Sequence, residues 1–281
     1  MEAIADFIAD FEEDIKHNRL ILPSLPEVAL KVRDIIENPK VNAHDISKVV
    51  SADPALSARL IRVANSPLYR AVREIENVQD AVTRMGMATV RHLVNSLVME
   101  QLYQPKVSSA YADYLRVSWE HSTLVAAICR ILAKNYTRLN PDQALFAGLI
   151  HDIGVLPIIS KVELYADRFD EDVDLDDLIH QHHGHVGEVL LKHWNFPKDM
   201  IAVVAEHENL KRDSKEGVDY VDLVLIANLH CYIGSEHRLG QVALDTVPAF
   251  KKLKLKPKQA VDAIREASKE IKALQRLFLG K

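Results

Sequence analysis

Cysteine is almost absent from this sequence, and glycine is scarce. Only Cys129 and Cys231 occur, each within an apolar run that suits a small buried thiol, so a framework of disulfides is excluded. The chain has nine glycines among 281 residues, and alternation of β-branched residues is rare. Both shortages disfavour a fold built from strands and tight turns.

The sequence also lacks the marks of a secreted or membrane protein. Residues 1–14 mix acidic with apolar residues and have no basic start before an apolar stretch, so we expect no signal peptide. No apolar run reaches about 18 residues, so we expect no membrane-spanning helix and a cytoplasmic location. The formal net charge of -5 gives no general attraction to phosphate backbones or anionic lipid, so we expect neither nucleic acid nor membrane as a partner.

What the sequence does have is helical periodicity. Apolar residues recur at spacings of three and four along most of the chain, which predicts an all-α fold. Hydrophobic residues make up 48% of the chain, enough to bury a substantial core that divides into two lobes. The tripeptide Gln104-Pro105-Lys106 indicates a boundary. We therefore expect a two-lobed helical bundle, with an N-terminal helical subdomain over residues 1–106 and a second helical subdomain over 107–281.

Polar side chains that can bind metal interrupt the apolar helix faces of the second half. His121, His207 and Asn228 each follow the spacing of apolar neighbours, so their side chains should point inward, and the doublet His151-Asp152 closes an apolar run. Neutral imidazoles with a carboxylate form a good ligand set for zinc, iron or manganese. A shared metal would satisfy several buried polar groups at once, and the alternative is a hydrogen-bonded core without metal.

Short motifs in this chain occur in the same order as in a known bacterial family. They are Trp119-Glu120-His121-Ser122, His151-Asp152-Ile153-Gly154 and the segments 22–28, 53–56, 64–66, 81–86, 185–187 and 194–197. Together they resemble the HDOD family over about residues 19–209. HDOD proteins are all-helical relatives of the HD metal-dependent phosphohydrolases, which hold divalent metals between helices and mostly hydrolyse phosphate esters. The resemblance implies an HD-related second lobe and a role in bacterial signalling.

The same resemblance assigns residues to a metal site. The positions that fall on HD-type metal ligands are His121, His151, Asp152, His185 and His207. Asn228 stands where active HD enzymes usually supply a closing aspartate, and it joins the candidate metal set. Glu206 stands where the related HD-GYP phosphodiesterases have a histidine, and an acidic side chain can also ligate. Asp152 and Glu206 are the candidate catalytic residues.

Charge indicates how many metals such a site holds. Four neutral imidazoles and one carboxylate leave a residual charge of about +1 with one divalent ion and about +3 with two, if Glu206 stays outside. A mononuclear site is therefore easier to support than a dinuclear one. HD-GYP enzymes also carry a lysine directly after the His-Asp-Ile-Gly string, where this chain has Val155, and their Gly-Tyr-Pro motif is missing. We do not expect cyclic di-GMP hydrolysis.

Three functions remain open at this point. The resemblance favours a regulatory or output module with weak or no hydrolase activity, a protein partner in a signalling pathway, and a nucleotide or other phosphate compound as a further candidate ligand. The alternative is a metal-dependent phosphohydrolase acting on a nucleotide or other phosphate ester, in which the metal activates water and an unligated Glu206 or His207 moves a proton. The third is a helical scaffold whose histidines satisfy one another.

Overall fold

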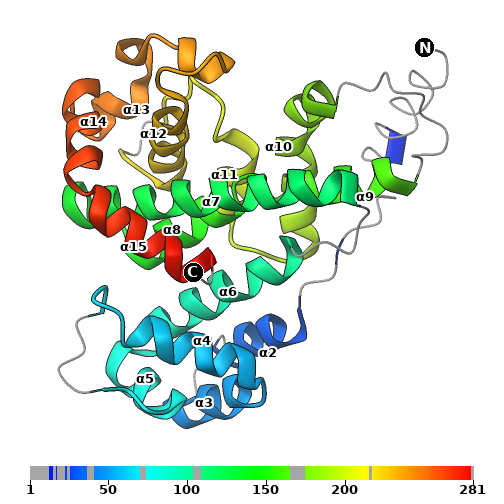
Figure 1. Cartoon of the computed structure of the whole chain (residues 1–281), viewed down its shortest axis with the longest axis vertical. Coiled ribbons are helices and arrows are strands. Elements are labelled where there is room, and N and C mark those ends of the chain that lie inside the picture. Colours follow the sequence, from blue (N-terminus) through cyan, green and yellow to red (C-terminus); the bar gives the residue numbers. More distant parts are fainter. Residues whose placement is uncertain are drawn as a thin grey trace.

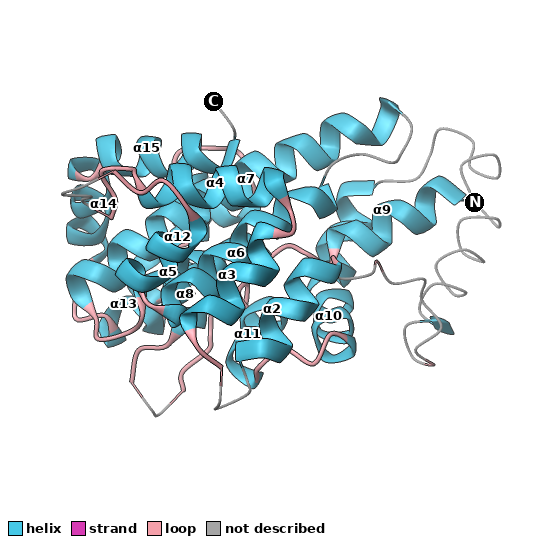
Figure 2. Cartoon of the chain, turned by 90° about the horizontal axis from the view of Figure 1, so that it is seen from below, coloured by secondary structure: helices cyan, strands magenta, loops and turns pink. Residues whose placement is uncertain are grey.

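The computed structural model describes residues 13–14, 17, 23, 26–36, 41–69, 74–103, 109–164, 175–214 and 217–279. Within these ranges the regular structure is helical throughout, and no strand is present (Figure 2). The helices are α2 (Glu27–Ile36), α3 (Ala43–Ser51), α4 (Pro54–Ala64), α5 (Val78–Met85), α6 (Met87–Tyr103), α7 (Ser109–Tyr136), α8 (Pro141–Ile150), α9 (Val155–Leu164), α10 (Leu175–His193), α11 (Lys198–Glu206), α12 (Tyr220–Tyr232), α13 (Pro248–Lys252), α14 (Pro257–Glu266) and α15 (Ser268–Leu279). The all-α prediction is confirmed.

The helices form two groups in space. Figure 1 shows α2 to α5 gathered in a lower lobe and α7 to α15 in an upper lobe, with α6 between them. Helix α6 contacts α2 and α4 on one side and α8 on the other, so its apolar residues serve both lobes. The predicted subdomain boundary at residue 106 lies outside the described residues and stays a prediction.

Polar side chains cap the first turns of helices in the lower lobe. Asn42 begins α3 by accepting the His44 backbone N–H at 2.8 Å, and Asp53 begins α4 by accepting from Leu56 at 3.0 Å. Such caps satisfy N–H groups that the first helical turn leaves without partners. After α4, the Asn65 amide both donates to and accepts from the backbone of Ile75, each at 2.8 Å. These two hydrogen bonds hold the residue after α4 next to Ile75, which precedes α5.

A buried polar contact joins the two lobes. The Tyr69 hydroxyl, just after α4, donates to the Asp142 carboxylate at 2.7 Å, and Arg130 on α7 donates to the same oxygen at 3.2 Å. The Arg130 guanidinium also lies 5.4 Å from the centre of the Tyr69 ring. Asp142 is in the first turn of α8, where a carboxylate is favoured by the helix dipole. The junction is therefore fixed by charge as well as by packing.

Buried His92 on α6 makes the stability of the fold depend on pH. Burial lowers its pKa to about 4, and the nearby charge of Arg91 acts in the same direction. As pH falls, His92 is protonated near pH 6.5 in the unfolded chain but only near pH 4 in the folded chain. The free energy of unfolding is therefore highest above about pH 6.5 and decreases as pH falls from there toward pH 4. We expect wild type to lose about 1.3 kcal/mol more than His92→Leu between about pH 7.5 and 5.5 in urea titrations. Parallel losses in the two proteins would contradict this.

The upper lobe is built around the long helix α7, against which α8 lies very closely. A Cβ atom on Gly148 of α8 would lie 2.4 Å from the Cα of Ala126 on α7, so only glycine permits this approach. The segment Pro141–Leu164 is long and apolar enough to cross a membrane, contrary to our expectation that no apolar run has the necessary length. Its most apolar stretch is 83% buried inside the protein, which is typical of a core helix in a soluble protein.

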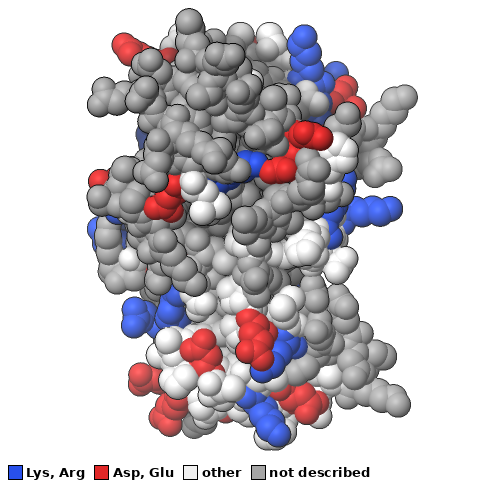
Figure 3. All heavy atoms as spheres, turned by 90° about the vertical axis from the view of Figure 1, so that its right-hand side faces the viewer, with Lys and Arg blue, Asp and Glu red and all other residues white. Residues whose placement is uncertain are grey.

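Charges of both signs are mixed on the surface. On the face shown in Figure 3, the described acidic and basic side chains of the lower lobe lie beside one another. Elsewhere Lys134 pairs with Glu270 at 3.0 Å and Lys192 with Glu188 at 2.7 Å. Pairs of this kind are exposed and contribute little to stability.

Candidate metal centre

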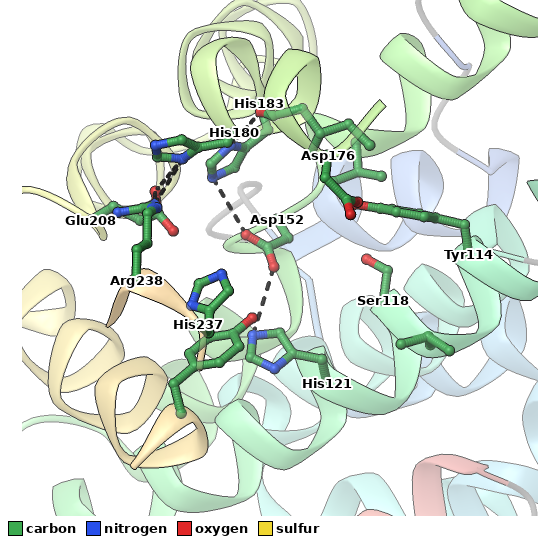
Figure 4. Close-up of a pocket in the computed structure, with 14 residues that line it drawn as sticks. Tyr114, Ser118, His121, Asp152, Asp176, His180, His183, Glu208, His237 and Arg238 are labelled. Carbon is green, nitrogen blue, oxygen red and sulfur yellow. Dashed lines mark hydrogen bonds and ion pairs between the residues drawn. The ribbon is translucent and has the colours of Figure 1, made fainter. Parts of the chain in front are cut away.

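Four elements of the upper lobe converge on one carboxylate. His121 comes from α7, the doublet His151-Asp152 from the turn that follows α8, His183 from α10, and His207 from the end of α11. Figure 4 shows His121 and His183 on opposite sides of Asp152, with their rings directed at its two oxygens. His121 and His183 reach this point because each occupies an inward position on a largely apolar helix face, and His151, Asp152 and His207 follow directly on the ends of α8 and α11.

All four imidazoles present Nε2 to the Asp152 carboxylate. His151 and His121 approach Oδ2 at 3.1 and 3.7 Å, while His207 and His183 approach Oδ1 at 3.2 and 3.6 Å. The potential ligand atoms form two triads that share Asp152, and within each triad they lie no more than 4.8 Å apart. One triad holds His121 and His151, and the other holds His183 and His207. The cluster is compact enough to enclose a cation.

Backbone carbonyls fix the orientation of three of these rings. Nδ1 of His151 lies 2.8 Å from the oxygen of Gly148, Nδ1 of His183 lies 2.7 Å from Ile179, and Nδ1 of His207 lies 3.1 Å from Val204. A carbonyl oxygen can only accept, so each Nδ1 carries the hydrogen. In the neutral rings the lone pair is then on Nε2, which is the arrangement of a histidine prepared to bind metal.

This arrangement requires a positive charge in the cluster. Nε2 of His183 and Nε2 of His207 are 3.2 Å apart, and in neutral rings both would be acceptors facing each other. Nε2 of His121 and Nε2 of His151 are buried and make no hydrogen bond of normal geometry among the described residues, and the Asp152 Oδ2 that both approach is itself an acceptor. A proton or a metal ion relieves such contacts, and a divalent metal satisfies more of them at once. The residues present therefore fit a divalent metal.

The pKa shifts reflect the same competition between burial and charge. Burial acts to raise the pKa of Asp152, but His151, His207 and His183 outweigh it and hold that pKa well below its usual range. Burial lowers the pKa of His121 to about 4, with a further contribution from His151. Burial also acts to lower the pKa of His207, yet its hydrogen bond to Asp152 raises the pKa overall. Among His121, His183 and His207, the last is the only ring whose pKa is raised.

Two predicted site residues lie elsewhere. The His185 side chain is 58% exposed and points to Glu188 at 3.5 Å, because the helix turns it away from the cluster. His183, two residues earlier, occupies the place that we expected for His185. Glu206 forms an ion pair with Arg212 at 2.6 Å and is not among the residues that line the cavity. Its prediction as a ligand or proton carrier is not supported by this placement.

The remaining predicted residue lies at the edge of the cluster. Asn228 on α12 is buried, its side chain interacts with His121, and its Oδ1 has no hydrogen-bond partner among the described residues. The signal for His183 was present in the sequence, since Ile179, Val186 and Leu190 share its helix face and all are buried. Because the sequence alone does not show where α10 begins, it did not show which of the neighbouring histidines points inward.

A cavity of about 340 Å³ opens beside Asp152. His121, Asp152 and His183 line its inner wall. Further polar side chains that line it, which we call its mouth, were missed by sequence reasoning; they include Tyr114, Asp176, His180, Glu208, Tyr232, His237 and Arg238. Small molecules that enter this cavity meet the cluster directly. A second opening is lined by His180, His183, His185 and His207, so it also meets the cluster.

Known protein structures share this architecture. A protein of Shewanella amazonensis SB2B, named as a candidate metal-dependent phosphohydrolase, superposes with a TM-score of 0.83 at 28% identity and covers 99% of this chain and 100% of its own. An HDOD domain protein of unknown function from Geobacter sulfurreducens superposes with a TM-score of 0.72 at 22% identity, over 95% of this chain and 99% of its own. The second likeness shows the fold alone.

Relatives in sequence point the same way. An uncharacterized protein of Treponema pallidum (strain Nichols) is 27% identical over 240 residues, which are 80% of this chain but 44% of the relative. The chain thus spans less than half the length of that protein. The HDOD domain itself is matched over residues 22–210, close to the range expected from the motifs and more than half of the chain. The chain belongs to the HDOD family.

Proposed function

We propose that this chain is a bacterial signalling protein that acts as a regulatory or output module, with one divalent metal in the cluster and weak or no hydrolase activity. Iron, manganese and zinc are the metals that suit a set of imidazoles with one carboxylate. We further propose a cytoplasmic location and a protein partner in a signalling pathway, with no role for nucleic acid or membrane. A small phosphate compound is the ligand class that suits the cavity.

The observation that supports weak or absent hydrolysis is the single carboxylate of the cluster. Asp152 is the one acidic side chain in both triads, and the buried position beside His121 holds the neutral Asn228. Two divalent ions would leave a residual charge of about +3 on this ligand set, whereas one leaves about +1. Although two triads are present, charge favours occupation by a single ion.

A metal-dependent phosphohydrolase is the second candidate. It is favoured by the cavity, which exposes Asp152 to a ligand, and by the name of the Shewanella protein. A bound metal would supply an activated water and polarise a phosphoryl oxygen. In this chain Asp152 would hold the metal, and Glu208 rather than Glu206 lies in the cavity where a proton could be moved.

Metal content and turnover separate these functions. Protein purified without chelator should contain about one divalent metal per chain by elemental analysis. It should show little Mn²⁺-dependent hydrolysis of p-nitrophenyl phosphate or bis(p-nitrophenyl) phosphate. Clear turnover that disappears in Asp152→Ala would instead establish the hydrolase. Failure to bind any metal would leave the scaffold of mutually satisfied histidines.

Replacement of Asn228 by aspartate tests why activity is weak. A second carboxylate beside His121 adds an oxygen ligand and one negative charge, so we expect Asn228→Asp to lower the Mn²⁺ dissociation constant by at least about tenfold. The metal-free variant should unfold more easily, because the new buried carboxylate lies near Asp152. Calorimetric titration with Mn²⁺ measures the first effect and thermal unfolding the second.

The control adds the same charge outside the cluster. Asn135 is exposed near the end of α7 and lines neither opening to the cluster, so Asn135→Asp should leave Mn²⁺ affinity close to that of wild type. If Asn228→Asp behaves like this control, Asn228 does not face the bound metal, and the explanation given for weak hydrolysis fails.

A further inference from the structure

The connection that follows α12 reaches back over the cavity. We call residues 233–241 the strap; it lies beyond the matched HDOD domain, which ends at residue 210. Ser235 Oγ donates to the backbone oxygen of Tyr232 at 2.8 Å, and Gln241 donates to the backbone oxygen of Ser235 at 3.0 Å. A Cβ atom on Gly240 would lie 2.4 Å from the Tyr232 oxygen, so glycine permits the tight return of the strap. Buried Leu239 anchors it to the core.

The strap places two side chains in the cavity beside the metal centre. His237 stacks on Tyr232 with ring centres 3.8 Å apart, and Tyr232 in turn lies 5.4 Å from the His121 ring. Arg238 enters from the same connection, and Figure 4 shows it next to Glu208 and His180. Of the described residues that line the cavity, Arg238 is the only lysine or arginine.

Arg238 uses only part of its hydrogen-bonding capacity. Its Nη2 donates to Nδ1 of His180 at 2.8 Å and to the Glu208 carboxylate. Its Nε and Nη1 have no acceptor among the described residues, and its side chain is 39% exposed. A guanidinium has five N–H donors in a planar fork that matches the oxygens of a phosphate. Donors are therefore available at the cavity mouth.

The position of Arg238 relates it to the cluster. Its partner His180 is on α10, three residues before His183, so the two histidines lie on one face of the helix with roughly 5–6 Å between their Cβ atoms. An anion that contacts Arg238 is thus a near neighbour of the site proposed for the metal. Glu208 competes for the same guanidinium, so its charge must oppose the binding of any anion there.

We propose that Arg238 binds a phosphate group of the small molecule that occupies this cavity, with the phosphate lying between Arg238 and the His–Asp cluster. This inference rests on the proposed function for the metal and for the phosphate ligand. It deepens that function by naming the residue that binds the phosphate. Glu208 holds Arg238 in position and is the anion that the phosphate displaces. Two variants should then have opposite effects, which a purely structural ion pair would not produce.

Inorganic phosphate is the probe, measured by isothermal titration calorimetry with the Mn²⁺-loaded chain. Arg238→Ala should weaken phosphate binding by about tenfold or more, because charged hydrogen bonds are lost. Glu208→Gln should tighten it severalfold, since the competing charge is removed while the side-chain shape stays. Arg265→Ala is the matched control, because Arg265 on α14 is exposed with a single carboxylate partner and lines none of the cavity. Thermal unfolding of each variant verifies the fold.

Separate titrations distinguish failure of this inference from failure of the metal site. Mn²⁺ affinity is measured first, and Arg238→Ala should match wild type. If wild type binds no Mn²⁺, the metal proposal fails, and the same phosphate titrations on metal-free protein decide the role of Arg238. Equal phosphate affinity of Arg238→Ala and wild type, weaker binding by Glu208→Gln, or no phosphate binding to wild type with and without Mn²⁺ would each overturn the inference.

Discussion

Asp152→Asn should reduce the affinity for Mn²⁺ by more than about 100-fold. Loss of a group that merely orients a metal ligand typically costs 10- to 100-fold in affinity, and Asp152 is itself the residue on which four imidazoles converge. The amide keeps the size of the side chain but removes the charge that both triads share. Calorimetric titration with Mn²⁺ measures the loss, and elemental analysis of the purified variant should find almost no metal.

A second carboxylate of the same cavity provides the control. Asp176 lines the cavity mouth but belongs to neither triad, so Asp176→Asn should bind Mn²⁺ nearly as wild type does. If Asp152→Asn retained wild-type affinity, the metal would have to lie outside this cluster.

Gly154→Ala should damage both the fold and the centre. A Cβ atom at this position would lie 1.9 Å from the backbone oxygen of His183 and 2.6 Å from the nitrogen of Gly187, both within α10. Neither atom can rotate away, so α10 must shift as a whole. Overpacking of this kind costs about 3 kcal/mol or more when the backbone has to move. We expect that loss in urea unfolding, together with weaker Mn²⁺ binding because His183 is displaced.

A neighbouring glycine separates this clash from ordinary helix effects. Gly184 is also on α10, but its added Cβ would lie 3.3 Å from the backbone oxygen of Val204. Gly184→Ala gains up to about 1 kcal/mol from helix propensity and loses part of it to this contact, so it should stay close to wild type in stability. Similar losses in the two variants would show that close packing at Gly154 does not determine the position of His183.

Helical periodicity was sufficient to place the inner part of the centre. His121 and His207 were expected to point inward because their neighbours are apolar, and the structure brings both to Asp152. His183 and His185 differ by about half a helical turn, so only one of them can share the apolar face of Ile179, Val186 and Leu190. Without the start of α10, the string of neighbouring histidines obscured which one does. Family motifs favoured His185, and the helix phase placed His183 in the cluster instead.

The residues at the mouth of the cavity could not be predicted from sequence patterns. His237 and Arg238 begin a 3-10 helix, η2 (Arg238–Gln241), which is too short to show periodicity, and nothing in their spacing relates them to His180 on α10. Glu206 and Glu208 are separated by one turn residue, yet only Glu208 enters the cavity. Such placements depend on how α11 ends and where the strap returns, and both are decided by tertiary packing.

The carbonyls of Gly148, Ile179 and Val204 have a thermodynamic consequence for capture of a cation. By holding three rings through Nδ1, they remove the rotational freedom of those rings during folding. The nitrogen ligands are therefore already aligned when the ion binds, so binding loses no further conformational entropy of these three side chains. The centre should therefore behave as a rigid receptor, whose selectivity among ions of different size is determined by the backbone of α8, α10 and α11.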